Sequence, residues 1–252
     1  MQNLNDIKNY SPANNLLKGR NILVTGASDG IGEVAATTFA KYGATVILLG
    51  RKKNKLEQLY DEIVSANYET PIIVELDLFS STIKEYQKLN EEIIENIGKL
   101  DGLLHNASIL GEMKTLKEYD INIFDEVMTT NLRSNFLLTK AVLPAMERSD
   151  DASIIFTSSG VGRKGRAYWG AYAVSKFATE GLMETWADEL ENIGSIRVNS
   201  INPGATCTKM RKQAYPMEPE QRNPKPHEIM PAYLFLIGPD SNGINGCKIE
   251  AQ

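Results

Sequence analysis

The chain has 252 residues, of which 42% are hydrophobic and 23% are charged, and its formal net charge is −5. This length is enough to bury a substantial core without disulfides or metals, and the acidic balance argues against a nucleic-acid partner. Two cysteines, two histidines far apart in the sequence and no apolar run near ~20 residues exclude a disulfide framework and make a metal site or a membrane span unexpected.

Short apolar runs alternate with amphipathic stretches along the whole chain. Several runs are apolar throughout, which is typical of parallel strands covered on both faces. The alternation predicts an α/β fold with one Rossmann-type, doubly wound parallel sheet of about seven strands and helices on both faces. The strand order typical of such a fold, 3-2-1-4-5-6-7, is the order we expect. The expected strands are 21–25, 45–49, 72–76, 102–105, 153–157, 197–201 and an edge strand near 248–251, and the expected helices are 31–42, 53–66, 81–97, 121–146, 171–192 and 227–236.

The sequence has no repeat, no low-complexity tract and no long linker, so we expect a single domain over residues 1–252. A polar, Asn-rich extension occupies residues 1–17 and lacks the apolar segment of a signal peptide, which favours the cytoplasm. The stretch 215–226 carries four prolines and is predicted to be an irregular loop before the last helix.

A glycine-rich loop follows the first predicted strand and leads directly into a helix. It reads Thr25-Gly-Ala-Ser-Asp-Gly-Ile-Gly, with glycines at 26, 30 and 32. The glycines permit a tight turn, a close approach of a pyrophosphate and close packing of the helix, whose N-terminus favours anions. The loop therefore predicts dinucleotide binding by Gly26, Ser28, Asp29, Gly30, Ile31 and Gly32.

The end of the second predicted strand bears on the choice of cofactor. An NAD enzyme carries a carboxylate there, which binds the ribose hydroxyls and repels a 2′-phosphate. This chain instead reads Leu49-Gly50-Arg51, followed by two lysines. Arg51 can bind a phosphate through two hydrogen bonds, so NADP(H) is favoured over NAD(H). The alternative is that residues 51–53 form only a solvated turn, and Asp29 is a mild signal against NADP.

Tyr172 and Lys176 occur in a predicted helix at the spacing i, i+4, which places both side chains on one face. Ser159 lies thirteen residues before Tyr172, at the end of a predicted buried strand. Reduction of a carbonyl places negative charge on oxygen, which calls for a proton donor and a hydrogen-bond donor. We expect Tyr172 to be the general acid or base and Ser159 to bind the substrate oxygen. The Lys176 cation and the positive nicotinamide of the oxidised cofactor should lower the pKa of Tyr172.

Together these motifs resemble the short-chain dehydrogenase/reductase family, in its compact branch, over about residues 18 to 250. The runs 25–32, 46–51 and 175–181 look especially like a bacterial subgroup, the YciK-like oxidoreductases. The resemblance implies an NADP(H)-dependent oxidoreductase that moves hydride between nicotinamide and a small carbonyl or alcohol. It also implies a fourth catalytic residue, Asn131, which interrupts its helix and helps to hold a water that relays protons to Lys176.

The resemblance implies further contacts and some departures from the family pattern. Three parts of the chain differ from the family's usual residues: His105, Ser108 and the final residues 250–252. Ser108 could change the turn beside the cofactor, and the C-terminal residues could change the border of the active site. Residues 206–237 are expected to form a lid over the substrate. The implied cofactor-binding residues, beyond the loop, Arg51, Tyr172 and Lys176, are Asp77, Leu78, Asn106, Ala107, Pro203, Gly204, Thr206 and Thr208.

Several questions stay open from the sequence. A homodimer or homotetramer through helices 121–146 and 171–192 is expected by analogy. Arg163, Lys164 and Arg166 either attract an anionic substrate or are simply solvated. The alternative functions are a protein that binds NADP as a sensor or scaffold without turnover, and a related isomerase or dehydratase, which usually carries a larger substrate domain.

Overall fold

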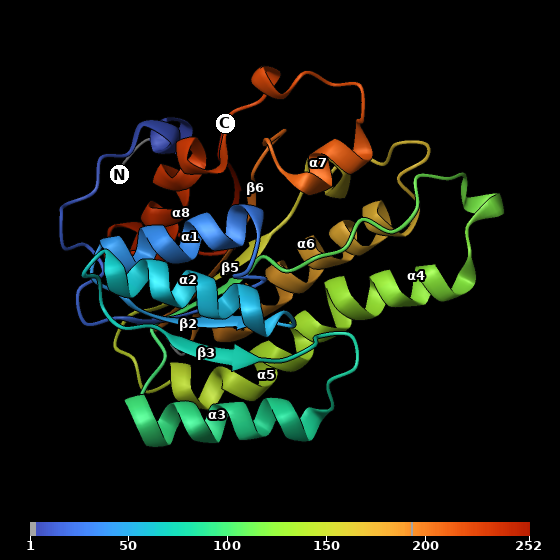
Figure 1. Ribbon diagram of the computed structural model, residues 1–252. Coiled ribbons are helices and arrows are strands. Elements are labelled where there is room, and N and C mark those ends of the chain that lie inside the picture. The colour runs from blue at the N-terminus through green and yellow to red at the C-terminus, as the bar shows by residue number, and fades with distance from the viewer. Residues whose placement is uncertain (1–3, 193) are drawn as a thin grey trace.

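The computed structural model describes residues 4–192 and 194–252 and arranges them around one seven-stranded sheet with helices on both faces (Figure 1). All neighbouring strands are parallel, and their order is β3-β2-β1-β4-β5-β6-β7, which confirms the predicted sheet. The strands are β1 (Asn21–Thr25), β2 (Thr45–Gly50), β3 (Ile72–Glu75), β4 (Gly102–His105), β5 (Ala152–Thr157), β6 (Ile196–Asn202) and β7 (Lys248–Glu250).

The core lies in two layers, one on each face of the sheet. Side chains alternate along a strand, so Ile22 and Val24 of β1 pack into one layer and Leu23 packs into the other. Helices α1 (Gly30–Lys41), α2 (Lys53–Ser65) and α8 (Met230–Ile237) cover the first face. Helices α3 (Ile83–Ile97), α5 (Ser134–Met146) and α6 (Gly170–Glu191) cover the second. Burial on both faces explains why most strands read as continuous apolar runs.

Three elements differ from the sequence prediction, while the other boundaries agree within two residues. The long helix expected over 121–146 is divided into α4 (Ile121–Met128), a π-helical turn (Thr129–Arg133) and α5. The last helix begins as a 3₁₀ turn (Pro226–Ile229), because Pro231 has no N–H to donate and fits only the first turn of α8. A further short helix, α7 (Lys209–Ala214), lies in the segment expected to form a lid.

The described part of the N-terminal segment packs against α8, on the first face of the sheet. Tyr10 donates a hydrogen bond to Asp240 at 2.7 Å, and its ring meets that of Phe235 at 5.3 Å between centroids. Ile7 and Leu17 are also buried. Residues 4–17 are therefore anchored to the domain core, and residues 1–3 lie outside the described residues.

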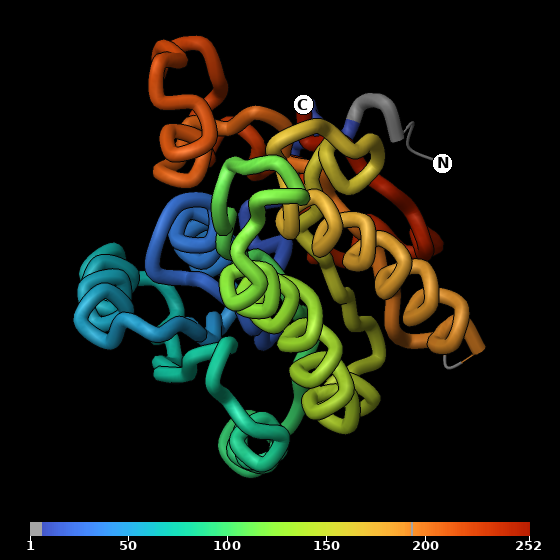
Figure 2. The backbone as a smooth tube through the Cα atoms, turned by 90° about the vertical axis from the view of Figure 1, so that its right-hand side faces the viewer, coloured from blue at the N-terminus to red at the C-terminus, as the bar shows by residue number. Residues whose placement is uncertain are grey.

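Helices α4 and α6 lie side by side on the outside of the second layer (Figure 2). Four apolar side chains on α4, α5 and α6 are exposed: Ile121, Phe136, Val174 and Phe177. None of the helices in the described chain is long and apolar enough to cross a bilayer.

Candidate active site

A cavity of about 390 Å³ opens at the carboxyl ends of the strands, where parallel α/β sheets place their ligands. Of the predicted site residues, Gly32, Asn131 and Lys176 do not line the cavity. The others do: Gly26, Ser28, Asp29, Gly30, Ile31, Arg51, Asp77, Leu78, Asn106, Ala107, Ser159, Tyr172, Pro203, Gly204, Thr206 and Thr208. The structure thus brings both ends of the predicted site into one pocket.

The glycine-rich loop has a shape that side chains would prevent. Gly26 and Gly30 have φ values of +66° and +59°, which favour glycine. A Cβ on Gly32 would lie 2.3 Å from the Gly26 carbonyl oxygen and 2.5 Å from Asn106 Nδ2. The Asp29 side chain caps none of the first N–H groups of α1. The loop and the helix N-terminus therefore fit the pyrophosphate of a dinucleotide.

Thr25 joins the ends of the two central strands beside this loop. Its Oγ1 accepts the N–H groups of Asn106 and Ala107, both at 3.0 Å, and donates to the Leu104 carbonyl at 3.3 Å. Asn106 Nδ2 also donates to the Thr25 carbonyl at 3.3 Å. Thr25 was not predicted as a site residue, although its position directly before the first glycine of the loop could have indicated that it belongs to the site.

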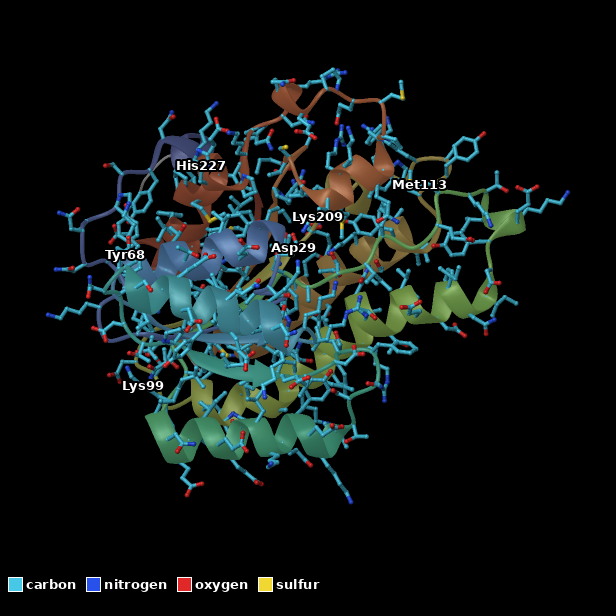
Figure 3. The ribbon with its side chains drawn as sticks, viewed as in Figure 1. Asp29, Tyr68, Lys99, Met113, Lys209 and His227 are labelled. Atoms are coloured by element: carbon cyan, nitrogen blue, oxygen red, sulfur yellow. The ribbon has the colours of Figure 1, made fainter. Side chains whose placement is uncertain are left out.

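Asp29 connects the glycine-rich loop to α2 and α7. Its Oδ2 lies 3.0 Å from Lys55 Nζ and 2.7 Å from Lys209 Nζ, and Asp29 and Lys209 lie next to each other at the centre of Figure 3. Burial acts to raise the pKa of the Asp29 carboxyl, but the hydrogen bonds from Lys209 and Lys55 hold it below its ordinary value. The negative charge that counted against NADP is therefore paired with two cations.

The end of β2 presents positive charge to the cavity. Arg51, Lys52 and Lys55 all line it, together with Ser28 from the glycine-rich loop. Neither Arg51 nor Lys52 forms an ion pair with any residue that the structure describes. Sequence reasoning missed Lys55, which lies one helical turn beyond Arg51. Free cations here, without a carboxylate at Gly50, suit a phosphate on the ribose.

Tyr172 lies in the first turn of α6, where its side chain reaches the cavity. Its hydroxyl forms a hydrogen bond with Ser159, which precedes a 3₁₀ turn after β5 and also accepts the Val161 N–H at 3.4 Å. Lys176 Nζ lies 5.5 Å from the centroid of the Tyr172 ring and donates to the Thr157 carbonyl at 2.7 Å. Tyr172 and Ser159 thus meet at the cavity, and Lys176 lies beside Tyr172 without lining it.

The pKa values of this group differ from the sequence prediction. Burial raises the pKa of Tyr172 to about 12, and the hydrogen bond with Ser159 only partly opposes this. Burial lowers the pKa of Lys176 to about 8, with Glu180 acting in the opposite direction. The expected lowering of the Tyr172 pKa is not seen in the protein alone, because burial of the phenol outweighs the opposing effects and the Lys176 ammonium donates to the Thr157 carbonyl. The Tyr172 hydroxyl is therefore protonated at neutral pH.

Asn131 lies in the π-helical turn that interrupts the predicted long helix, as expected, and is fully buried. Its Oδ1 accepts the Ile109 N–H at 2.8 Å, and its Nδ2 donates to the Ile109 carbonyl at 2.9 Å and to Ser175 Oγ at 3.1 Å. π-Helical turns of this kind occur often at functional sites. The side chain fixes the cavity wall at Ile109, and its role in a water relay stays a prediction.

Residues at the departures from the family pattern have identifiable partners. His105 stacks on Phe156 with 4.6 Å between centroids and bonds Thr139 Oγ1 at 2.8 Å, and burial lowers its pKa to about 3, so it is neutral. Ser108 lines the cavity. Gln252 Nε2 donates to the Pro203 carbonyl at 2.6 Å. The C-terminal residue Gln252, which differs from the family pattern, therefore fixes the loop after β6 through this hydrogen bond.

The basic segment after Ser159 does not face the cavity. Arg163 pairs with Glu180, at 3.6 Å, and with Glu250. Lys164 and Arg166 are exposed, and none of the three cations lines the pocket. Arg163 is therefore a structural ion-pair partner, whereas the solvated alternative holds for the other two. In the described residues no group of three or more His, Cys, Asp or Glu side chains is arranged to hold a metal ion.

Comparison with known proteins identifies the family. The sequence model of the family described as short chain dehydrogenase matches residues 20–219. The chain belongs to the short-chain dehydrogenase/reductase family. It is similar to YciK of Escherichia coli (strain K12), an uncharacterized oxidoreductase, with 49% identity over 243 residues that cover 96% of each chain. The resemblance to this subgroup is confirmed, and the chain is an oxidoreductase of the family.

Solved structures agree with this assignment. A structure from Pseudomonas syringae, assigned as a short chain dehydrogenase, is 55% identical with a TM-score of 0.95 and covers 96% of this chain and 98% of its own. A short chain dehydrogenase from Escherichia coli CFT073, complexed with NADPH, is 49% identical with a TM-score of 0.93 and covers 96% of this chain and all of its own. NADPH binding by so similar a protein agrees with the free cations at the end of β2.

Proposed function

We propose that this short-chain dehydrogenase/reductase is an NADP(H)-dependent enzyme that interconverts a small carbonyl compound and its alcohol. One observation carries the proposal. A single pocket is lined by Tyr172 and Ser159, with Lys176 behind the Tyr172 ring, and by the cations Arg51 and Lys52 at the end of β2. The first group suits proton transfer to oxygen, and the cations suit the 2′-phosphate of NADP(H).

The residues that would hold the cofactor follow from the shape of the pocket. The loop 26–32 and the N-terminus of α1 would bind the pyrophosphate, and Asp77 with Leu78 would face the adenine. Arg51, Lys52, Lys55 and Ser28 would surround the 2′-phosphate. Asn106, Ala107, Pro203, Gly204, Thr206 and Thr208 line the remaining wall, on the nicotinamide side.

When bound, the nicotinamide supplies or accepts the hydride with its two electrons. In the reducing direction the carbonyl carbon gains the hydride, the C=O π bond breaks, and the oxygen takes the hydroxyl proton of Tyr172. Ser159 donates a hydrogen bond to the same oxygen, which stabilises its developing charge. The Lys176 ammonium stabilises the phenolate that remains, and Asn131 keeps the adjacent wall in place through Ile109.

We further propose that residues 1–252 act as one domain, that residues 206–237 close over the substrate, and that the protein works in the cytoplasm as a homodimer or homotetramer. The exposed apolar side chains Ile121, Phe136, Val174 and Phe177 on α4, α5 and α6 support pairing through these helices. The unpaired cysteines Cys207 and Cys247 agree with a reducing compartment. A sensor or scaffold that binds NADP without turnover is not favoured, because Tyr172, Lys176, Ser159 and Asn131 are all present.

Titration with NADPH and NADH tests the cofactor part of the proposal. Arg51→Ala removes a charged donor to the 2′-phosphate, which is worth about 1.5–3 kcal/mol, so NADPH affinity should fall roughly ten- to hundred-fold. NADH affinity should change little. Lys53→Ala is the matched control, because Lys53 carries the same charge two positions away but does not line the cavity. Equal losses for both nucleotides in Arg51→Ala would contradict the 2′-phosphate assignment.

A further inference from the structure

The end of the cavity beyond Tyr172 is apolar. Leu110, Trp169, Met210 and Ala214 line it and pack against one another and against Tyr172 as a small separate hydrophobic cluster. They come from three parts of the chain: the segment after β4, the approach to α6, and α7. The Trp169 ring lies 5.7 Å from the Tyr172 ring between centroids. An indole therefore stands beside the proposed proton donor, where the group attached to a reacting carbonyl would lie.

Among the described residues, the cation that lines this end is Arg211, and it is already neutralised. Arg211 donates two hydrogen bonds to Glu218, at 2.6 and 2.7 Å, and its guanidinium lies 4.0 Å from the centroid of the Tyr215 ring. The hydrogen bond from Arg211 lowers the pKa of Glu218 to about 2, so the carboxylate stays charged. The Tyr215 ring in turn lies 6.0 Å from that of Trp169. This arrangement extends the aromatic wall and leaves the charge of Arg211 paired with that of Glu218.

The other cations near the cavity are directed elsewhere. Lys209 pairs with Asp29 at the phosphate end, and Arg163 pairs with Glu180 and Glu250. An anionic or polyhydroxylated group placed against this wall would therefore lose water, and no free cation among the described residues of the wall would compensate an anion, which costs free energy. An apolar group would instead gain burial against Trp169 and Met210.

We propose that the substrate is a carbonyl compound, or its alcohol, whose reacting carbon carries an uncharged apolar group. The inference rests on the proposed function, because it uses the same pocket and the same proton donor. The chemistry is the reduction given above: the carbonyl carbon gains a hydride from NADPH, its oxygen gains the Tyr172 proton, and the C=O becomes CH–OH.

A matched panel of carbonyls tests the proposal. Benzaldehyde and cyclohexanecarbaldehyde are the apolar probes, glyceraldehyde is the hydroxylated one, and 4-carboxybenzaldehyde adds an anion to the same ring. We expect kcat/KM with NADPH to be roughly ten-fold or more higher for the two apolar aldehydes than for either polar one. Faster turnover of glyceraldehyde or of the carboxylated ring would overturn the proposal.

Substitution of Trp169 separates the wall from the chemistry. Trp169→Ala should lower kcat/KM for benzaldehyde roughly ten-fold or more and for glyceraldehyde by less than about three-fold. Tyr168→Asn is the matched control, because Tyr168 is exposed, does not line the pocket, and has a φ of 71° that asparagine accepts. Equal losses for both aldehydes in Trp169→Ala would show that the indole is only structural.

The Arg211–Glu218 pair gives a second test. Glu218→Gln removes the negative charge that compensates Arg211, so kcat/KM for 4-carboxybenzaldehyde should rise about three- to ten-fold. Met217→Ala, at a neighbouring position that is 94% exposed, is the control. No gain with the carboxylated ring would contradict the claim that Glu218 neutralises this end of the pocket.

A binding measurement tests the apolar end of the pocket even if no aldehyde is turned over. The chain has two tryptophans, and Trp186→Phe leaves Trp169 as the only one. This change is conservative, because Trp186 Nε1 is buried without a hydrogen-bond partner in the described structure. With NADP⁺ present, benzyl alcohol should change the Trp169 fluorescence in a saturable way and glycerol should not. A response without turnover would disprove the proposed function alone, and no response to benzyl alcohol would disprove the apolar substrate.

Discussion

Asn131 should contribute to stability and to activity through its contacts with Ile109. Asn131→Ala removes three hydrogen bonds of 2.8, 2.9 and 3.1 Å from a fully buried side chain. A buried hydrogen bond contributes about 1 kcal/mol net, and partners left unsatisfied cost more, so the free energy of unfolding should fall by about 3–5 kcal/mol. The freed Ile109 backbone also lines the cavity, so kcat should fall as well.

Urea unfolding followed by fluorescence measures this change. Asn131→Asp should not restore stability, because its second oxygen would face the Ile109 carbonyl where Nδ2 now donates. Asn122→Ala on α4 is the control: it replaces an exposed asparagine and should change stability by less than about 0.5 kcal/mol. A decrease of the free energy of unfolding by less than about 1 kcal/mol in Asn131→Ala would refute the reasoning, because the loss of three buried hydrogen bonds should destabilise the protein by more than this.

Three further predictions concern the cofactor loops and the pH dependence. Gly32→Ala places a Cβ 2.3 Å from the Gly26 carbonyl oxygen, so NADPH affinity should fall roughly ten-fold or more, and unchanged affinity would contradict the loop geometry. Gln252→Ala frees the Pro203 carbonyl, so NADPH affinity, measured by the same titration, should fall by about two- to ten-fold. Carbonyl reduction should be constant below pH 8 and fall as the pH rises through about 8, where Lys176 loses its charge while Tyr172 stays protonated, and a rate that stays constant to higher pH would contradict the role of Lys176.

The parts of the fold that depend on continuous burial were predictable from the sequence. The apolar runs of β1, β4 and β5 give the strands almost to the residue, because both faces of the sheet are covered. The helix propensities of residues 129–133 do not predict the break of the long helix, because Asn131 forms its hydrogen bonds with residues 22 and 44 positions away. Only the family resemblance indicated it.

The electrostatics of the site were the least predictable part. The pKa of Tyr172 depends on its burial and on where the Lys176 ammonium donates, and neither follows from an i, i+4 spacing. Likewise the sequence does not distinguish Arg163 from its neighbours Lys164 and Arg166. Its ion-pair partners Glu180 and Glu250 lie too far along the chain to be inferred from local sequence. The short helix α7, which brings Met210 and Ala214 to the cavity, lies in the segment 206–237 expected to form a lid, where no helix before residue 227 was predicted.

The central claim is that Tyr172 transfers the proton, and Tyr172→Phe tests it most directly. The variant keeps the ring in the apolar cluster and loses only the hydroxyl that bonds Ser159. Oxidation of NADPH is followed with benzaldehyde, and NADPH binding is titrated in parallel. The account predicts a loss of kcat of roughly 10²- to 10⁴-fold with NADPH affinity changed by less than about three-fold. Turnover within a few-fold of the wild-type rate would contradict the assignment of the proton donor.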